Sequence, residues 1–387
     1  MANAYPRKED LYQKECFYPL HAFVCGECFL VQLAAFHTPD QMFSEYAYFS
    51  SYSETWLKHA EAYVEYMINR FGFNSRSQVV EIGSNDGYLL QYFKKSGVPV
   101  LGVEPAQNVA KVAQAANIPT SVNFFGLKTA KRLVQEGGQA DLLVANNVLA
   151  QVPDLNDFVK GLRTLLKPHG IVTIEVPHLV KLMEENQFDT IYHEHFSYFS
   201  FITLQRIFAE HGLSIFDVEQ LPTHGGSLRL YARHVKDATQ SITTAVEDLR
   251  GRERQAGLNL LETYAAFAPR VQETKRKLLE FLIQAKRVGK SIVGYGAPAK
   301  GNTLLNYCGI RSDFIDYTVD RSPHKQNHYL PGTHIPIYHP DRIKATRPDY
   351  LLILPWNLKD EIMQQMQQIR EWGGRFVVPI PQVEVYA

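Results

Sequence analysis

The sequence predicts an α/β protein built on parallel, doubly wound sheets, and three observations support this. The chain has 387 residues, more than a single ordinary core accommodates. Apolar strand-like runs alternate with helical patterns twice along it, which is typical of parallel sheets covered on both faces. Hydrophobic residues make up 45% and charged residues 21%, which excludes disordered and fibrous classes. We therefore expect a well-packed protein of several domains.

The chain begins with a mixed, aromatic-rich segment, for which we expect a small lobe over residues 1–50. Residues 54–71 then place apolar side chains at helical spacing, among them Trp56, Ala60 and Tyr63. This spacing predicts a helix ahead of the first strand.

The first alternating set predicts a domain over residues 51–236. Its strand-like runs are residues 78–83, 99–105, 141–149 and 171–177, and the helical patterns between them cover residues 89–97, 108–117 and 157–170. Nearly continuous apolar runs suit strands buried on both faces of a parallel sheet.

Charged residues at helical intervals over residues 237–290 predict one or two connecting helices. A second alternating set predicts a smaller α/β domain over residues 291–387. Its strands are expected at 290–296, 314–320, 349–357 and 374–381, and its helices at 299–308 and 360–373.

Lys plus Arg and Asp plus Glu each number 40, so no overall field attracts nucleic acid or an acidic membrane, and we expect neither partner. Four cysteines are too few for a disulfide scaffold and suit a reducing compartment. The first residues do not resemble a signal peptide, and no apolar run reaches 18 residues. We expect a cytoplasmic protein.

A glycine-rich turn follows the first predicted strand. The segment VVEIGSNDGYLL places Gly83, Asn85, Asp86 and Gly87 between a strand and a helix, where backbone amides can meet a ligand. Gly83 and Gly87 lack the middle glycine of the dinucleotide fingerprint, which argues against a nicotinamide or flavin cofactor. About twenty residues later, Glu104 ends the second strand, where an acidic side chain can accept bonds from ribose hydroxyls.

This combination resembles the class I S-adenosylmethionine-dependent methyltransferases. The resemblance implies that the turn holds the methionyl part of the cofactor, with Glu81 supporting its amino group, and that Glu104 and the adjoining Pro105 hold the ribose. Two further pairs join the expected cofactor site. Asn146 and Asn147 end the next strand, and Phe124 and Phe125 lie where the family places a loop over the adenine, although either ring could instead be core.

The segment IYHEHFSYF, at 191–199, carries a second constellation. His193 and His195 are two residues apart, so only an extended segment would align them on a metal, whereas the helical HExxH zinc motif needs its two His four residues apart. Tyr192, Glu194 and His195 instead supply a phenol, a carboxylate and a general base. A satisfied polar cluster beneath an aromatic loop remains the alternative.

Several motifs together resemble the nucleotide-sugar C-methyltransferases over essentially the whole chain. They are YAYFSSYSETWLKHA, YHEHFSYFS, LPTHGGSLR, GYGAPAKGNTLLNYCGI, DRSPHKQN and PG-x-HIP. The resemblance implies a small zinc-binding N-terminal lobe, a methyltransferase domain and a C-terminal Rossmann-like α/β domain. It also implies methylation of C3 in a thymidine-diphosphate-linked 4-keto deoxysugar.

The resemblance assigns roles to single residues. His195 becomes the base that removes the C3 proton, with Glu194 beside it, while Tyr192 and Tyr48 neighbour the keto oxygen. His224, in the THGGS segment, becomes a substrate-binding candidate, although packing of its turn is an equal alternative. In the C-terminal domain the substrate candidates are Lys300, Asp320, Arg321, Lys325 and Gln326, with ordinary packing as the alternative.

The sequence departs from the family at two places. Cys25 and Cys28 form half of a four-cysteine zinc ribbon, and the first pair is absent, so either the chain starts late or it functions without the metal. Gln151 stands where relatives often have His, which puts proton transfer there in doubt.

Other functions remain as alternatives. An O- or N-methyltransferase acting on a nucleotide sugar would keep the cofactor site but would need no enolate chemistry. An NAD-dependent sugar oxidoreductase would need the dinucleotide fingerprint, which both halves lack.

Overall fold

The computed structural model describes residues 2–43 and 49–387, and these fall into two compact units. Unit 1 comprises the chain up to Ala22, Leu179–His195 and Leu260–Ala387. Unit 2 comprises Phe23–His178 and Phe196–Asn259. The units are not contiguous along the chain, unlike the segments expected from the sequence, because the segment 179–195 packs with the C-terminal part.

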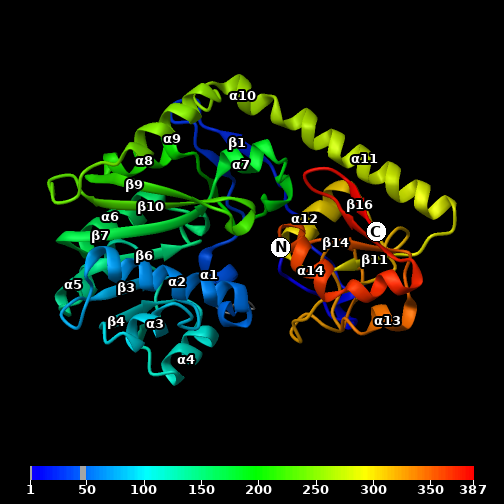
Figure 1. The fold of residues 1–387 in the computed structure, drawn as a ribbon, viewed down its shortest axis with the longest axis horizontal. Coiled ribbons are helices and arrows are strands. Elements are labelled where there is room, and N and C mark those ends of the chain that lie inside the picture. The colour runs from blue at the N-terminus through cyan, green and yellow to red at the C-terminus, as the bar shows by residue number, and fades with distance from the viewer. Residues whose placement is uncertain (1, 44–48) are drawn as a thin grey trace. The chain divides into compact units, whose positions relative to one another are not determined.

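Unit 2 is built on a seven-stranded sheet of order β5-β4-β3-β6-β7-β10-β9 (Figure 1). The strands are β3 (Val79–Ile82), β4 (Val100–Val103), β5 (Thr120–Ser121), β6 (Ala140–Asn146), β7 (Leu166–Pro177), β9 (Leu213–Leu221) and β10 (Ser227–His234). The first five are parallel, and β10 pairs antiparallel with both β7 and β9. The four strands predicted for this domain are confirmed.

The β9–β10 hairpin was not predicted. Its strands interrupt the apolar pattern with Asp217, Glu219 and Arg229, which usually indicates a solvent-facing side. Here the charges pair with one another instead, with Arg229 bonded to Glu219 across the hairpin at 3.0 Å. Such pairing is invisible in a single strand's sequence.

Helices cover both faces of this sheet. They are α1 (Pro39–Phe43), η2 (Ser50–Tyr52), α2 (Glu54–Phe71), α3 (Leu90–Lys95), α4 (Gln107–Ala115), α5 (Leu127–Gln135), η3 (Leu149–Gln151), α6 (Leu155–Leu165), α8 (Phe201–Glu210), η5 (Thr223–Gly225) and α9 (Thr244–Gln255). One core packs α2, α3 and α4 on one face, and another packs α5, α6, α8 and α9 on the other. A small sheet of β1 (Ala22–Val24), β2 (Val31–Leu33) and β8 (Ser197–Tyr198) completes the secondary structure.

The predicted helix α2 is confirmed, and it runs antiparallel to β7. Tyr63 hydrogen-bonds Thr173 at 2.5 Å, and His59, one turn earlier, bonds Glu175, two residues further along β7. The first turns of α2 therefore lie at the carboxyl edge of the sheet, where parallel α/β sheets bind ligands.

Unit 1 is built on a six-stranded sheet of order β13-β12-β11-β14-β15-β16. The strands are β11 (Ile292–Tyr295), β12 (Thr318–Val319), β13 (Ile337–Tyr338), β14 (Tyr350–Ile353), β15 (Arg375–Val378) and β16 (Glu384–Tyr386). Only β16 is antiparallel to its neighbour. The predicted Rossmann-like C-terminal sheet is confirmed.

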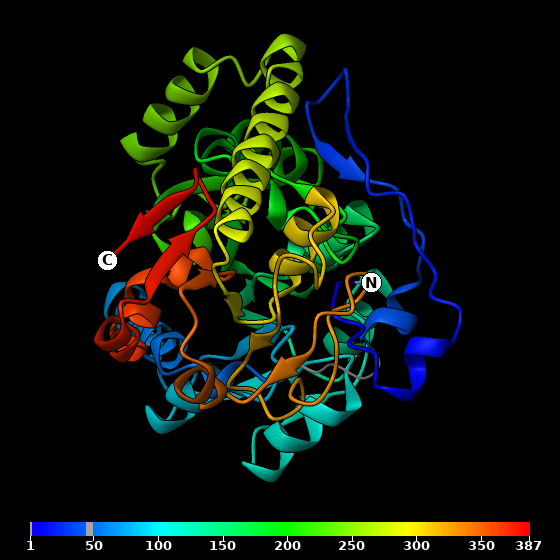
Figure 2. The same ribbon diagram turned by 90° about the vertical axis from the view of Figure 1, so that its right-hand side faces the viewer.

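Unit 1 also contains helices, several of which contribute to one hydrophobic core around this sheet, and the long α11 is visible in Figure 2. They are η1 (Glu9–Tyr12), α7 (Leu179–Glu184), η4 (Phe188–Thr190), α10 (Leu261–Ala265), α11 (Phe267–Arg287), α12 (Ala299–Cys308), α13 (Arg342–Thr346), η6 (Trp356–Leu358), α14 (Lys359–Gln365) and η7 (Gln367–Trp372). The predicted helix 360–373 is therefore divided into an α-helix and a 3-10 helix.

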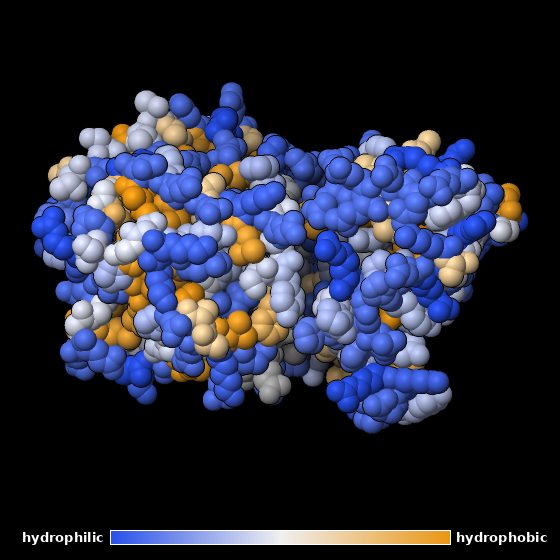
Figure 3. Space-filling model, turned by 60° about the horizontal axis from the view of Figure 1, so that its bottom comes forward, coloured by the Kyte–Doolittle hydropathy of each residue, from blue (hydrophilic) through white to orange (hydrophobic). Residues whose placement is uncertain are grey.

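Hydrophobic and hydrophilic residues are mixed over the surface seen in Figure 3. None of the helices in residues 2–43 and 49–387 is long and apolar enough to cross a membrane.

Candidate active site

The glycine turn of unit 2 follows the fully buried strand β3. Gly83, Asn85 and Gly87 all have positive φ, and a Cβ on Gly83 would overlap Val148. Glycine is therefore required at position 83. The side chains of Asn85 and Asp86 accept hydrogen bonds from the backbone of the segment before α2, at 2.9 and 3.1 Å.

Glu104 lies beside this turn, as predicted. Its carboxylate accepts hydrogen bonds from the backbone amides of Asn85 at 2.9 Å and Ala106 at 2.8 Å. Burial raises its pKa, and these two bonds oppose the shift. The bonds fix the carboxylate at the end of β4, next to Pro105.

Several buried polar atoms at this edge have no hydrogen-bond partner in the described part of the chain. They are Glu81 Oε2, Ser84 Oγ, Asp86 Oδ1 and both amide atoms of Asn146. Burial raises the pKa of Glu81 well above its ordinary value. Because buried polar groups are normally satisfied, this cluster indicates a missing polar ligand. An amino-acid moiety and a ribose, as in S-adenosylmethionine, fit these donors and acceptors.

The other residues predicted to bind the cofactor lie partly at the carboxyl edge of the sheet and partly in the core of unit 2. Asn147 has positive φ, and its amide donates to the Glu175 carbonyl at 2.8 Å. Phe125 packs edge-to-face on Phe158 in the core, whereas Phe124 is 37% exposed. Of the two rings, only Phe124 has a largely accessible surface.

The segment YHEH belongs to unit 1 and follows η4. The Nδ1 of His195 lies 3.3 Å from the Thr190 carbonyl, and the ring packs against Tyr192 with centroids 4.2 Å apart and an interplanar angle of 35°. A carbonyl accepts only, so Nδ1 donates to it, and in the neutral imidazole this tautomer leaves the lone pair on Nε2.

Glu194 is buried, and Asn3 Nδ2 donates to its Oε2 at 2.7 Å. Burial raises the pKa of this carboxyl. His193 bonds the Pro19 carbonyl at 3.0 Å instead of sharing a ligand with His195. Tyr48 lies outside the described residues.

In unit 1 the predicted substrate residues follow β11 and β12. Lys300 bonds Asn357 at 2.8 Å and lies over the Trp356 ring at 4.4 Å. Lys325 bonds the Ala297 carbonyl at 2.9 Å. The further members of this group are Asp320, which accepts from the Ala297 amide, Gln326, which bonds the Asp320 carbonyl, and Arg321, which is exposed. The internal bonds of Lys300 support a packing role for it.

His224 belongs to unit 2. It is exposed, has φ of 56° and packs on the ring of Trp56 at 5.2 Å. A positive φ is uncommon for a residue other than glycine.

One network at the carboxyl edge was not predicted. His59 and Arg229 both contact the buried carboxylate of Glu175. The sequence did show a charged residue, Glu175, inside the apolar strand IVTIEVP. Its partners could not be predicted, because they lie 116 and 54 residues away along the chain.

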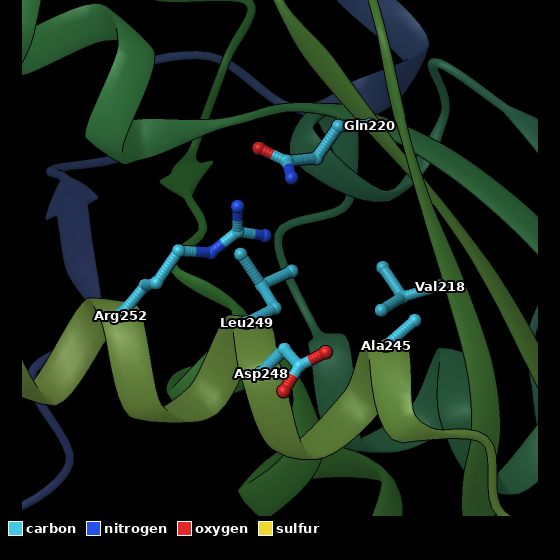
Figure 4. A pocket seen from close by; sticks show the side chains of 6 residues that line it. All are labelled: Val218, Gln220, Ala245, Asp248, Leu249 and Arg252. Atoms are coloured by element: carbon cyan, nitrogen blue, oxygen red, sulfur yellow. The ribbon is translucent and has the colours of Figure 1, made fainter.

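A pocket of about 470 Å³ lies between β9 and α9, on the sheet face opposite to α2 (Figure 4). Its lining consists of Val218, Gln220, Ala245, Asp248, Leu249 and Arg252. None of the predicted site residues is among them.

Comparison with known proteins agrees with this architecture. A family model described as a methyltransferase domain matches residues 56–218, a C-methyltransferase C-terminal domain matches residues 222–381, and a putative zinc binding domain matches residues 1–43. The chain is 37% identical to C-methyltransferase NovU of Streptomyces niveus over 377 residues, which cover 97% of this chain and 90% of NovU.

Other similarities cover smaller parts of the chain. A ubiquinone biosynthesis O-methyltransferase of Bartonella tribocorum is 31% identical over 100 residues, which cover 25% of this chain and 40% of that protein. Magnesium protoporphyrin IX methyltransferase from Synechocystis, solved with bound S-adenosylmethionine, is 15% identical with a TM-score of 0.34, covering 46% of this chain and 78% of that one.

The sheet, the glycine turn and the matched domains define a class I S-adenosylmethionine-dependent methyltransferase. Within that class, the chain belongs to the C-methyltransferase family that includes NovU. S-adenosylmethionine is its methyl donor.

The N-terminal match raises the question of zinc. Structural zinc takes four ligands, and Cys25 and Cys28 supply two. Residues 2–43 and 49–387 hold no group of three or more His, Cys, Asp or Glu that could bind a metal. The described residues therefore do not fit a zinc ion. Instead, α8 holds the segment that carries Cys25 and Cys28. Arg206 donates to the Glu27 carbonyl at 2.6 Å, and Thr203 donates to the Cys28 carbonyl at 3.2 Å.

Proposed function

We propose that this protein methylates C3 of a nucleotide-linked 4-keto deoxysugar, with thymidine diphosphate as the expected nucleotide, through a base-generated enolate. The observation that carries the proposal is the anchored imidazole of His195, whose Nδ1 faces the Thr190 carbonyl. The other nitrogen, Nε2, then has the lone pair that a general base needs. The family resemblance and the relationship to a C-methyltransferase support the reaction class.

The reaction requires a nucleophilic carbon. A carbonyl at C4 makes the C3 proton removable, because the electron pair left on carbon delocalises onto the oxygen. His195 takes that proton, and the adjacent ring of Tyr192 restricts how its imidazole can turn. Glu194 supplies a carboxyl group next to His195 in the chain, held by Asn3. Tyr192 and Tyr48 are proposed neighbours of the keto oxygen.

The residues of unit 2 hold the donor in this proposal. Glu81, Asp86 and Asn146 bind the methionyl part, and Glu104 accepts from the ribose hydroxyls. S-adenosylmethionine supplies a methyl group on a sulfonium, and its transfer breaks the carbon–sulfur bond. Fixing the donor in one orientation lowers the entropic part of the barrier.

The proposed substrate contacts are a further step. Arg321 offers an exposed guanidinium to a diphosphate, and Asp320, Lys325 and Gln326 shape the loop beside it. His224 and Lys300 remain proposed substrate contacts, although Lys300 is bonded to Asn357.

O- or N-methylation of a nucleotide sugar is the second candidate, since it would use the same donor residues. This reaction needs no base that removes a proton from carbon. Membership of a C-methyltransferase family favours the first candidate. That membership also excludes the oxidoreductase alternative.

A deuterium experiment tests the proposal. The protein is incubated in heavy water with a thymidine-diphosphate 4-keto deoxysugar, with and without S-adenosylmethionine. We expect deuterium at C3 without the donor and a carbon-bound methyl with it, both detected by NMR. His195→Asn should keep donor binding and lose both reactions.

His193→Asn is the matched control, because His193 lies two residues away and bonds only a backbone carbonyl among the contacts described above. Its turnover should stay close to that of the unmodified protein. Methylation on oxygen or nitrogen would contradict the proposed reaction, and unchanged turnover in His195→Asn would remove His195 from the role of base.

A further inference from the structure

Unit 2 contains a second oriented imidazole, that of His59 on α2. Its Nε2 lies 3.1 and 3.0 Å from the two carboxylate oxygens of Glu175. Arg229 Nε donates to the same carboxylate at 2.8 Å, and the guanidinium also bonds Glu219 at 3.0 Å. The Glu175 side chain is fully buried, and its pKa is lowered by His59 and Arg229 against the effect of burial. Glu175 is therefore an ionised carboxylate.

This contact determines how the ring presents its second nitrogen. Because a carboxylate only accepts, Nε2 carries a proton toward Glu175. Trp56 stacks on the ring at 4.8 Å with an interplanar angle of 17°, which restricts its rotation. Within the described part of the chain, Nδ1 makes no hydrogen bond, and the side chain is 20% exposed. Nδ1 is thus available to a ligand.

The location is the same edge that carries the donor residues. Glu175 is the register partner of Asn146, whose side-chain amide is buried without a partner among the described residues. Trp56 also stacks on Tyr88, the residue after Gly87, at 6.0 Å. Thr223 Oγ1, next to the strained His224, is likewise buried without a partner among residues 2–43 and 49–387. His59 Nδ1 and Thr223 Oγ1 thus lie at this edge in addition to the atoms proposed to hold the donor, and they are available to a second ligand.

The network around His59 contains charges of both signs. Glu175 and Glu219 contribute two negative charges, and Arg229 contributes one positive charge. A proton on both nitrogens of His59 makes the sum zero. In that form Nδ1 is a donor, which suits an oxygen that gains negative charge.

We propose that His59 is a catalytic residue that donates its Nδ1–H to the keto oxygen of the acceptor as the enolate forms. This inference rests on the proposed function. When the base removes the C3 proton, the C–H pair forms the C3–C4 double bond and the carbonyl pair moves to oxygen. C3 then bonds to the methyl, the carbon–sulfur pair stays on sulfur, and the carbonyl re-forms. His59 keeps its proton throughout, and Glu175 and Arg229 are positioning residues.

Two substitutions separate this role from a structural one. In His59→Gln, the amide can still reach Glu175, as Nε2 does, but no donor remains at the place of Nδ1. In His59→Asn, the shorter amide keeps a donor near Nδ1 and gives up the bond to Glu175. The measurements are C3 deuterium exchange without donor, methyl transfer with donor, S-adenosylmethionine affinity and melting temperature.

We expect His59→Gln to keep donor affinity and melting temperature and to lose about 100-fold in both exchange and kcat, the scale of a lost oxyanion donor. His59→Asn should recover part of that loss despite a lower melting temperature. The control is His178→Gln, because His178 also makes a buried contact with a carboxylate, 2.7 Å from Glu253. It should lower stability without changing exchange per folded molecule.

Exchange in His59→Gln within threefold of the unmodified protein would overturn the inference. Equal losses in His59→Gln and His59→Asn that follow the loss of folded protein would overturn it as well, because they indicate a structural role. If the unmodified protein neither exchanges C3 hydrogen nor forms a carbon-bound methyl, the proposed function itself fails. That outcome can be distinguished from a failure of the inference about His59, because it is observed with the unmodified protein before any variant is measured.

Discussion

At the scale of single residues, the proposed donor site depends on backbone conformations that few side chains tolerate. Gly83 has φ of 69°, and its α-carbon faces Val148. Asn85 adopts a similar conformation, and its amide is held by Glu104. Val148 and Glu104 thus hold the turn at two of its residues. Its backbone amides therefore need no further ordering when the donor binds.

Gly83→Ala should therefore disrupt the turn. A methyl group there meets Val148 and also carries the strain of positive φ, about 1–2 kcal/mol. We expect S-adenosylmethionine affinity to fall at least tenfold, as measured by titration calorimetry.

Gly137→Ala is its matched control, because Gly137 has φ of 82° and open space around its α-carbon. It should lower stability by about 1 kcal/mol and leave donor affinity unchanged. Equal donor affinity in the two variants would show that the overlap with Val148 does not matter.

At the scale of elements, one helix of unit 2 depends on another for its N-terminus. Glu253 of α9 accepts hydrogen bonds from the amides of Phe201 at 2.7 Å and Ile202 at 2.8 Å, in the first turn of α8. His178, just after β7, contacts the same carboxylate. Glu253 is 1% exposed, so these bonds lie in the interior. One carboxylate thereby joins a strand end and two helices.

Glu253→Gln should destabilise unit 2 strongly. The amide can accept at only one atom, and its NH2 faces donors that need an acceptor. Breaking a buried pair of this kind costs about 3–5 kcal/mol. Denaturant unfolding, with hydrogen exchange of α8 as the local readout, measures the change.

Glu247→Gln on the same helix provides the comparison, since Glu247 is 55% exposed and pairs with Arg250. Its cost should be at most about 1 kcal/mol. Similar costs for the two variants would contradict a special role for Glu253.

At the scale of the whole molecule, each unit has its own core and its own buried ionisable groups. In unit 1, burial raises the pKa of Asp189 to about 7, and it lowers the pKa of Lys300. Trp356 Nε1 donates to Asp189 at 2.8 Å. Both pKa shifts have the same cause, because burial disfavours the charged form of each group.

The stability of unit 1 should therefore decrease as pH rises. An unfolded Asp loses its proton near pH 4, whereas the folded Asp189 keeps it to about pH 7. Between these values the folded state binds more protons, so the free energy of unfolding falls by up to about 1.4 kcal/mol per pH unit. Asp189→Asn should flatten this slope and still accept from Trp356.

Hydrogen exchange of unit 1 between pH 5 and 8, corrected for the intrinsic rates, measures this slope. Asp313→Asn, at an exposed carboxylate of the same unit, is the control and should keep the slope. A slope that persists in Asp189→Asn would assign the effect to another group.

Local patterns allowed much of the molecule to be predicted. The alternation of apolar runs and helical spacing predicted most of the parallel strands of both sheets, because strands buried on two faces need apolar residues throughout. The two-residue strands β5 and β13 were not predicted. The glycine turn and Glu104 were found together, because strand, turn and next strand are close in sequence. The roles of His195 and its neighbours came from a family resemblance and remain proposals.

Contacts between distant parts of the chain could not be predicted. The bond between Asn3 and Glu194 joins residues 191 positions apart, and the bond between His59 and Glu175 joins residues 116 apart. The assignment of 179–195 to unit 1 likewise depends on packing. The sequence by itself determined the periodic elements and the glycine turn, because hydrophobic spacing and glycine conformation are local properties. Only the tertiary structure decided which charges meet in the interior, because a buried charge is stabilised by partners that its neighbours along the chain do not reveal.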